Sequence, residues 1–354
     1  MEMPSDVEMP AATEQARLFG AGPVPRHGPL DRFLRDRVYG EVLGMSGADL
    51  RFVLGPSDNG AMVRCDEVTT STPVMLKVYG LKWIDGRRWD RPALRADLMR
   101  REYDNLRRVQ PLGAGRGRHR VVRPFAAAAE LGATLAEELV LGPDLLHYIE
   151  AAARWSGNGE LDARLRQAAE FFADLHTLSA TGRPGDGRGA LAYLEKVVAQ
   201  LTDFRILTSA EAAALRSVGR AWEVPGRLGP PDEVLIHGDA TPTQFLFPPT
   251  GELVAVDFER LQYGDRAADI GRMAGELKHL FRLYTGDPWA GEPHIRHFYA
   301  AYLAAAAPAV EADALLDRAR FHMACSELRI ARNSWVDWDN RRFLVREAAA
   351  CLAP

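Results

Sequence analysis

The sequence predicts an α+β protein, because strand-like and helix-like hydrophobic patterns both occur within one chain of 354 residues. Residues 73–79 follow the alternating pattern of a strand. Residues 100–109 carry Tyr103, Leu106 and Val109 at helical spacing, which favours an amphipathic helix. A chain of this length fits two domains.

A strand–loop–strand hairpin with polar residues at its mouth is predicted further along the chain. Three apolar runs follow one another with short loops between them, at residues 234–236, 245–247 and 253–256. Asp239 and Gln244 lie in the first loop, and Asp257 closes the third run. Phosphoryl transfer from ATP needs such a set, because one carboxylate orients or deprotonates the attacking hydroxyl, while an amide oxygen and a second carboxylate hold Mg²⁺. His237 is interpreted as a packed, hydrogen-bonded core residue in preference to an acid or base.

This segment resembles the aminoglycoside phosphotransferase/choline kinase family, a branch of the protein-kinase-like fold. The family signature is HGDxxxxN followed by a DFE- or DFG-like triplet, and here residues 237–244 read HGDATPTQ and residues 257–259 read DFE. The resemblance implies that Asp239 is the catalytic residue and that Gln244 and Asp257 are metal ligands. Gln244 departs from the usual Asn, and it offers the same carbonyl on an arm one methylene longer.

The resemblance also implies the domain organisation of a protein-kinase-like, two-lobed fold. Residues 1–34 are Pro-broken and polar at their start and are expected to form a flexible tail. Residues 35–140 would form an N-lobe with a small antiparallel sheet and one helix, which covers the nucleotide. Residues 141–354 would form a larger, mostly helical C-lobe with the catalytic loop, the metal site and the acceptor pocket.

Lys77 is the candidate phosphate ligand of the N-lobe. The chain holds 44 Lys and Arg residues in all, yet only four are lysines, and one of them lies within the predicted strand 73–79. A compact ammonium on a flexible stem suits a phosphate clamp. The resemblance implies that Glu102, on the predicted helix, holds Lys77 against the ATP phosphates. The alternatives are an edge-strand lysine that faces water and a glutamate that pairs with arginines of its own helix.

Ser57 and Asn59 lie in a glycine-flanked turn, residues 55–60, between two predicted strands at residues 50–54 and 62–65. Such a turn covers ATP phosphates with backbone N–H groups in kinase-like lobes. The fingerprint GxGxxG is missing, and Asn-Gly is also a common hairpin turn. The resemblance implies that Ser57 and Asn59 bind the nucleotide, and an ordinary hairpin turn is the alternative.

The segment that follows the predicted strands 121–125 and 135–140 resembles the hinge between kinase lobes. Backbone groups near Glu138 and Val140 would meet the adenine edge there. Asp144 is predicted to cap the next helix. Further on, Asp269 begins an amphipathic helix and is expected to tie that helix to the catalytic loop as structural support; its apolar stripe comprises Ile270, Met273, Leu277 and Leu280.

Composition limits the classes of partner. A formal net charge of −4 gives no support for binding to nucleic acid or to an anionic membrane. No run of 18 apolar residues and no signal-peptide pattern occurs, so a cytoplasmic protein is expected, as a monomer or homodimer. The three cysteines are too few and too scattered for a disulfide framework or a zinc site.

The acceptor is the least determined part of the prediction. Residues 265–354 contain equal numbers of acidic and basic side chains, which argues against a polycationic aminoglycoside. One polar and aromatic group would suit a sugar or an amine, or would be an ordinary helix end; it comprises Glu327, Asn333, Trp335, Asp337, Trp338 and Asp339.

The sequence thus predicts an ATP- and Mg²⁺-dependent phosphotransferase that phosphorylates a hydroxyl of a small molecule, with a sugar or sugar-containing metabolite as the preferred acceptor. The alternative is a catalytically weak nucleotide-binding sensor or scaffold. Gln244 and the missing glycine fingerprint favour the alternative, whereas the intact Asp239, Asp257 and Lys77 oppose it.

Overall fold

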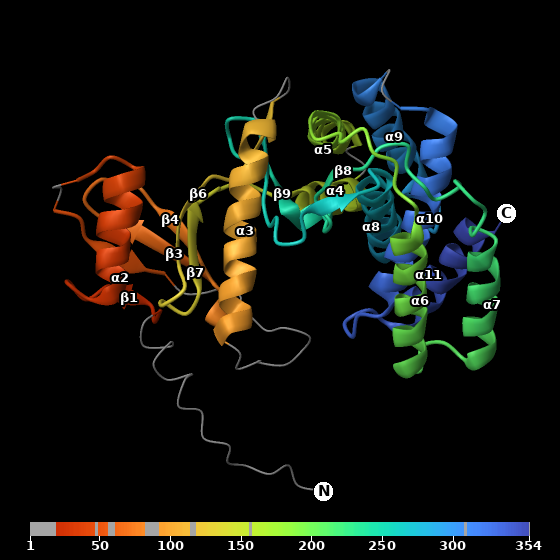
Figure 1. The fold of residues 1–354 in the computed structure, drawn as a ribbon, viewed down its shortest axis with the longest axis horizontal. Helices are drawn as coiled ribbons and strands as arrows, with labels where there is room; N and C mark the ends of the chain where they lie inside the picture. Colours follow the sequence, from red (N-terminus) through yellow and green to blue (C-terminus); the bar gives the residue numbers. More distant parts are fainter. Residues whose placement is uncertain are drawn as a thin grey trace, which may run out of the picture. The chain divides into compact units, whose positions relative to one another are not determined.

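A computed structural model describes residues 19–46, 49–55, 61–81, 92–113, 118–155, 158–307 and 310–353 (Figure 1). The chain divides into two compact units. Unit 1 comprises Met1–Arg108 and Val122–Val140, and unit 2 comprises Val109–Val121 and Leu141–Pro354. The first unit is built on an antiparallel sheet and the second is mostly helical, which confirms the predicted α+β class.

Unit 1 contains a six-stranded sheet in the order β1-β2-β3-β4-β7-β6, with every neighbouring pair antiparallel. Its strands are β1 (Gly22–Pro23), β2 (Phe52–Leu54), β3 (Met62–Glu67), β4 (Val74–Val78), β6 (Pro124–Ala128) and β7 (Thr134–Glu138). The helical segments are α2 (Pro29–Arg32), a π-helix at Phe33–Val42, a 3₁₀ turn at Tyr79–Leu81, and α3 (Pro92–Gly113), whose last residues belong to unit 2. The predicted alternation in β4 is confirmed, because Val74, Leu76 and Val78 are buried on one face.

Two expectations for unit 1 need correction. Residues 19–34 were expected to lie in a flexible tail, yet Phe19, Val24 and Leu30 are buried in the core of the unit, so apolar burial holds this segment in place. Residues 121–125 were expected to form one strand, but the chain leaves β5 (His119–Val121) and starts β6 at Pro124. Proline has no N–H to continue a ladder, which explains the break at this position.

Unit 2 contains two small sheets and eight helices among its described residues. Strands β5, β10 (Leu253–Ala255) and β9 (Phe245–Leu246) form one sheet in that order, and β8 (Val234–Ile236) pairs with β11 (Gln262–Gly264) in the other. A 3₁₀ turn, Pro242–Gln244, precedes β9. The helices are α4 (Leu145–Trp155), α5 (Asn158–Leu178), α6 (Arg188–Asp203), α7 (Ser209–Arg220), α8 (Ala267–Thr285), α9 (Glu292–Ala306), α10 (Ala312–Ala331) and α11 (Trp338–Leu352).

The predicted hairpin is present only in part. Strands β9 and β10 form an antiparallel pair, with Phe245 opposite Ala255, as expected. Strand β8 pairs instead with β11, with Ile236 opposite Gln262. The partner of β8 comes later in the chain, so the local pattern of apolar runs could not identify it.

Helices α8 and α10 pack along each other through two glycines of α8. A Cβ atom on Gly271 would lie 2.4 Å from the carbonyl oxygen of Ala319, and one on Gly275 would lie 2.8 Å from Cβ of Ser326. Neither position has room for a larger residue without a shift of the neighbouring backbone or side chain. The close approach brings polar side chains of α8 next to polar side chains of α10. Within the described parts of the chain, no helix has the length and apolar character needed to cross a membrane.

Candidate active site

The loop that follows β8 is held by the first turn of α8. The carboxylate of Asp269 accepts a hydrogen bond from the backbone N–H of His237 at 2.6 Å and another from that of Gly238 at 3.0 Å. The ring nitrogen Nε2 of His237 lies 3.0 Å from the carbonyl oxygen of Val256, and His237 is fully buried. These contacts fit the structural interpretation of both His237 and Asp269, because neither side chain is exposed to a substrate.

A buried histidine completes this support. Nε2 of His176 lies 3.2 Å from Asp269, and its Nδ1 lies 2.9 Å from the hydroxyl of Tyr302. Burial lowers the pKa of His176, although Asp269 opposes this shift. Burial alone would raise the pKa of Asp269, but hydrogen bonds from His176 and the backbone of His237 bring the pKa below its usual value. The loop is therefore anchored by an ionised carboxylate.

Gly238 is required by the shape of the loop. Its φ is +77°, and a Cβ atom there would lie 2.3 Å from the carbonyl oxygen of Arg260. Both the left-handed backbone and the close approach exclude a larger residue. The loop and the segment after Asp257 are thus in direct contact.

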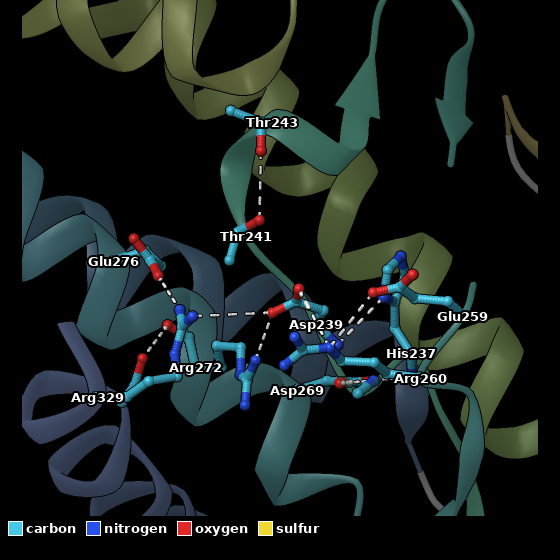
Figure 2. Close-up of polar contacts among 12 residues, drawn as sticks. His237, Asp239, Thr241, Thr243, Glu259, Arg260, Asp269, Arg272, Glu276 and Arg329 are labelled. Atoms are coloured by element: carbon cyan, nitrogen blue, oxygen red, sulfur yellow. Dashed lines mark hydrogen bonds and ion pairs between the residues drawn. The ribbon is translucent and has the colours of Figure 1, made fainter. Parts of the chain in front are cut away.

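Asp239 is surrounded by three arginines, as Figure 2 shows. Nη1 of Arg272 donates a hydrogen bond to Oδ1 of Asp239 at 2.6 Å. Nε of Arg260 lies 3.8 Å from Oδ2 of Asp239, and Nη1 of Arg329 lies 4.0 Å from Oδ1. Arg329 also forms a 2.5 Å ion pair with Glu276. The sequence interpretation did not include these arginines, since they come from a loop, α8 and α10.

Burial affects the charges of this cluster. Burial lowers the pKa of Arg329, and the neighbouring Arg272 lowers it further. Burial likewise raises the pKa of Glu276, against the effect of Arg329 and Arg272. Nε of Arg329 is buried and has no hydrogen-bond partner among the described residues. Among the described residues, the cluster thus combines three guanidinium groups with the carboxylates of Asp239, Glu259 and Glu276.

The two expected metal ligands lie on adjacent backbone segments. The carbonyl oxygen of Gln244 accepts a hydrogen bond from the N–H of Val256 at 3.0 Å, one residue before Asp257. Asp257 has a φ of +65°, an uncommon conformation for a residue with a side chain. One carboxylate oxygen of Asp257 lies within 4.8 Å of one of Glu259. Oxygen donors of this kind fit a hard cation such as Mg²⁺.

Glu259 is a candidate ligand that the sequence interpretation did not include. The third letter of the DFE triplet was the available signal, but a triplet alone does not show on which side of the chain its carboxylates lie. The structure brings Asp257 and Glu259 close to each other.

Lys77 lies in the interior of unit 1. Its ammonium forms a 2.5 Å ion pair with Glu102 and lies 3.8 Å from Glu137. The hydroxyl of Tyr79 donates a second hydrogen bond to Glu102. Strand β4 has neighbours on both sides, and the side chain of Lys77 is only 12% exposed, so the edge-strand alternative is wrong.

Four further residues are candidates for nucleotide binding, and the structure describes two of them. Ser57 and Asn59 lie outside the described residues. Glu138 ends β7, and its backbone N–H donates to the carbonyl of Arg123 at 2.9 Å. Val140 follows two residues later and is half-buried.

The polar and aromatic group near the C-terminus contains both buried and exposed side chains. Glu327 is fully buried, and neither of its carboxylate oxygens has a hydrogen-bond partner in the described part of the chain. Burial, with Glu347 nearby, raises the pKa of Glu327 well above its usual value. Trp335 and Trp338 are exposed, and Asp337 caps α11 through the N–H of Asn340 at 3.0 Å. The helix-end alternative therefore describes Asp337.

Comparisons with known proteins also indicate a phosphotransferase. The model of a family described as the phosphotransferase enzyme family matches residues 72–322. No curated protein sequence matches the chain significantly. The matched range contains Lys77, Glu102, Asp239, Gln244 and Asp257.

Solved structures resemble the chain along most of its length. An ethanolamine kinase from Plasmodium vivax is 12% identical, with a TM-score of 0.57, and the match covers 100% of this chain and 96% of that one. Choline kinase LicA from Streptococcus pneumoniae is 13% identical, with a TM-score of 0.53 and coverages of 84% and 92%. A structure of LicA in complex with AMP is 12% identical, with a TM-score of 0.51 and coverages of 92% and 99%. At these identities the likeness concerns the fold, and it confirms the predicted kinase-like class.

Proposed function

Because this chain belongs to the phosphotransferase enzyme family, and is thus a small-molecule phosphotransferase, we propose that it transfers the γ-phosphoryl group of ATP to a hydroxyl of its acceptor. The observation that carries this proposal is the placement of Asp239. Its loop is fixed by Asp269, and its carboxylate is a short distance along the chain from the oxygen donors Gln244, Asp257 and Glu259. Arg260 lies 3.8 Å from both Asp239 and Glu259, so the two segments are close in space. In-line phosphoryl transfer requires a fixed carboxylate near the oxygens that hold the metal.

Each residue then has a distinct role. Asp239 orients the acceptor hydroxyl and takes its proton as the hydroxyl oxygen bonds to the γ-phosphorus. The bond from the γ-phosphorus to the bridging oxygen breaks, and ADP leaves. Asp257 and Gln244, with Glu259, would hold Mg²⁺, which neutralises phosphate charge when bound. Lys77, held by Glu102, contacts the α- and β-phosphates.

ATP as the phosphoryl donor has support from two directions. One related structure contains AMP, which is a statement about that protein and its adenine site. In this chain, Lys77 is held in place by a buried glutamate, as a phosphate ligand should be. Glu138 and Val140 remain our candidates for backbone contacts to adenine, and Ser57 and Asn59 for contacts to the phosphates.

For the acceptor we propose a sugar or a sugar-containing metabolite. Two of the related structures are named for ethanolamine and choline, which carry a positive charge. In this chain the carboxylate expected to meet the acceptor hydroxyl is surrounded by Arg260, Arg272 and Arg329. The ammonium of an amino alcohol would have to compete with Arg272 for the carboxylate of Asp239, so an amino alcohol is disfavoured.

The test is the Asp239→Asn variant, assayed for ATP-dependent transfer to a panel of hydroxyl compounds. Nucleotide affinity should stay within a few fold, whereas turnover should fall by about 10²-fold or more, because only activation of the hydroxyl is lost. Asp97→Asn is the matched control, since Asp97 is an exposed carboxylate of α3 that pairs with Arg100. Turnover of Asp239→Asn equal to that of the wild type would remove Asp239 from the mechanism.

A further inference from the structure

We infer that the acceptor carries an anionic group, a carboxylate or a phosphate, close to the hydroxyl that is phosphorylated, and that Arg272 and Arg329 bind this group. The inference rests on the proposed function and deepens it by naming the chemical class of the acceptor. It starts from the three arginines around Asp239 shown in Figure 2.

The arginines reach Asp239 from separate elements of unit 2. Arg260 follows the DFE triplet, Arg272 lies on α8, and Arg329 lies on α10. Their nearest nitrogens lie 3.8, 2.6 and 4.0 Å from the carboxylate of Asp239, respectively. Of the three, Arg272 is the one within hydrogen-bond distance of Asp239, and Arg260 and Arg329 also lie near other carboxylates.

The other carboxylates nearby leave Arg272 dependent on Asp239. Glu259 lies 3.8 Å from Arg260, and Glu276 forms the 2.5 Å pair with Arg329. Among the described residues, Asp239 is the one carboxylate within ion-pair distance of Arg272. Burial also raises the pKa of Glu276, although Arg329 and Arg272 act against this shift.

The proposed reaction removes that remaining partner. When Asp239 takes the proton of the acceptor hydroxyl, its negative charge is lost, and Arg272 is left without an anion. The side chain of Arg272 is only 14% exposed, as is that of Arg329, so water can replace the lost partner only in part. An uncompensated charge in such a place is strongly unfavourable. An anionic group on the acceptor would compensate Arg272 and would also release Asp239 to act as a base.

The transferred phosphoryl group is the other anion that could contact Arg272, as arginines do in some phosphoryl-transfer enzymes. The two possibilities differ in a measurable way. A contact to the phosphoryl group helps every acceptor equally, whereas a contact to an anion of the acceptor helps only the acceptors that carry one. The experiment therefore compares acceptors that differ in this one group.

The acceptors tested would be glucose, glucosamine, glucuronic acid and glucose 6-phosphate, with glycerol and glycerate as a pair without a sugar ring. Calorimetry would measure binding, and phosphoryl transfer from ATP would give kcat/KM. We expect the carboxylate and phosphate compounds to exceed their neutral counterparts by about 10-fold or more, with glucosamine lowest. The acid and the phosphate together show which anion is preferred.

The variants are Arg272→Gln, Arg272→Lys and Arg329→Gln, each checked for its melting temperature. Arg272→Gln should bring the ratio of anionic to neutral acceptor towards one, and Arg272→Lys should retain part of the preference, because lysine keeps the charge without the planar fork. Arg346→Gln, an exposed arginine of α11, is the control that should keep the full preference. If Arg329→Gln fails to fold, Arg272→Gln and Arg272→Lys carry the test.

Three results would overturn the inference. Neutral or cationic acceptors could be preferred, no anionic compound could bind, or Arg272→Gln could lower transfer to glucose and glucuronic acid by the same factor. The first and third leave the proposed kinase function intact. Conversely, if no compound is phosphorylated although anionic ones bind through Arg272, the kinase function fails while the anion site stands.

Discussion

Asp269 and His237 connect helix α8 to the loop that carries Asp239, through a hydrogen bond of 2.6 Å from the backbone N–H of His237 to the side chain of Asp269. The same carboxylate accepts the N–H of Gly238 at 3.0 Å. Two backbone donors and His176 thus depend on one buried side chain. The position of Asp239, one residue further along, follows from this connection.

The first prediction concerns Asp269→Asn. An amide cannot accept both backbone N–H groups and the histidine, so at least one buried donor loses its partner. We expect the free energy of unfolding to fall by about 2–4 kcal/mol, and kcat to fall more than KM rises, because the loop no longer holds Asp239. Chemical denaturation and steady-state kinetics measure both effects. Asp97→Asn should change neither, and unchanged stability of Asp269→Asn would contradict the anchoring role.

The second prediction separates nucleotide binding from stability at Lys77. Lys77→Met should weaken ATP binding and also lower the melting temperature, because the fully buried Glu102 keeps its charge without its ammonium partner. The double variant Lys77→Met/Glu102→Gln should recover much of the melting temperature but not the ATP affinity.

Calorimetry with ATP and thermal unfolding without ligand give the two readouts. Lys196→Met, an exposed lysine of α6, is the control and should behave as the wild type. Lys77 would not be a phosphate ligand if the double variant bound ATP normally.

The third prediction concerns Gln244. Mg²⁺ requires near-octahedral oxygens at roughly 2.0–2.1 Å, so the length of the ligand arm matters. The 3₁₀ turn Pro242–Gln244 fixes where that arm begins. Gln244→Asn should therefore lower activity, although it restores the commoner family residue, and Gln244→Ala should lower it further and raise the Mg²⁺ concentration for half-maximal rate.

The neighbouring Thr243→Ala tests whether the turn itself is responsible, since Thr243 is exposed in the same turn. It should leave the Mg²⁺ requirement unchanged. An unchanged requirement in Gln244→Ala would leave Asp257 and Glu259 as the protein ligands.

The fourth prediction is a pH dependence of stability at His279. Burial lowers the pKa of this residue to about 4, and neither ring nitrogen has a hydrogen-bond partner among the described residues. Below pH 6.5 the unfolded chain binds a proton that the folded protein does not bind until about pH 4. The free energy of unfolding should therefore fall between these values, with roughly 3 kcal/mol from His279 as an upper bound.

His279→Leu should remove that part of the fall and leave stability at pH 7.5 equal or higher. Denaturation at several pH values measures it, with the exposed His147→Leu as the control. A residual slope is expected because burial also lowers the pKa of His119, His176 and His322. The same acid sensitivity in His279→Leu and wild type would refute the assignment.

Local patterns were sufficient for much of the fold and part of the site. The alternation around Lys77 predicted β4, and the helical stripe near Glu102 predicted α3; the pairing of Lys77 with Glu102 came from the family resemblance, and the two side chains are in contact. The apolar run before Asp257 likewise predicted β10. Each of these predictions depends on residues that are close in sequence.

The rest depends on tertiary neighbours. Arg329 lies far from Arg260 and Arg272 along the chain. A helical pattern shows which face of α8 or α10 is polar but not what that face contacts. The pairing of β8 with β11 is non-local in the same way. The contacts of these arginines with Asp239 could therefore not be predicted from local sequence patterns.

The close contact between α8 and α10 at Gly271 and Gly275 limits how acceptor preference can change among relatives. Helices in such tight contact cannot slide or rotate without severe overlap, so Arg272 and Arg329 keep a fixed spacing. New acceptor preferences would then arise by substitution of individual side chains, while the two helices keep their positions. Exchanging a few residues between family members should therefore transfer the specificity. The same two helices would make a suitable starting frame for engineered kinases.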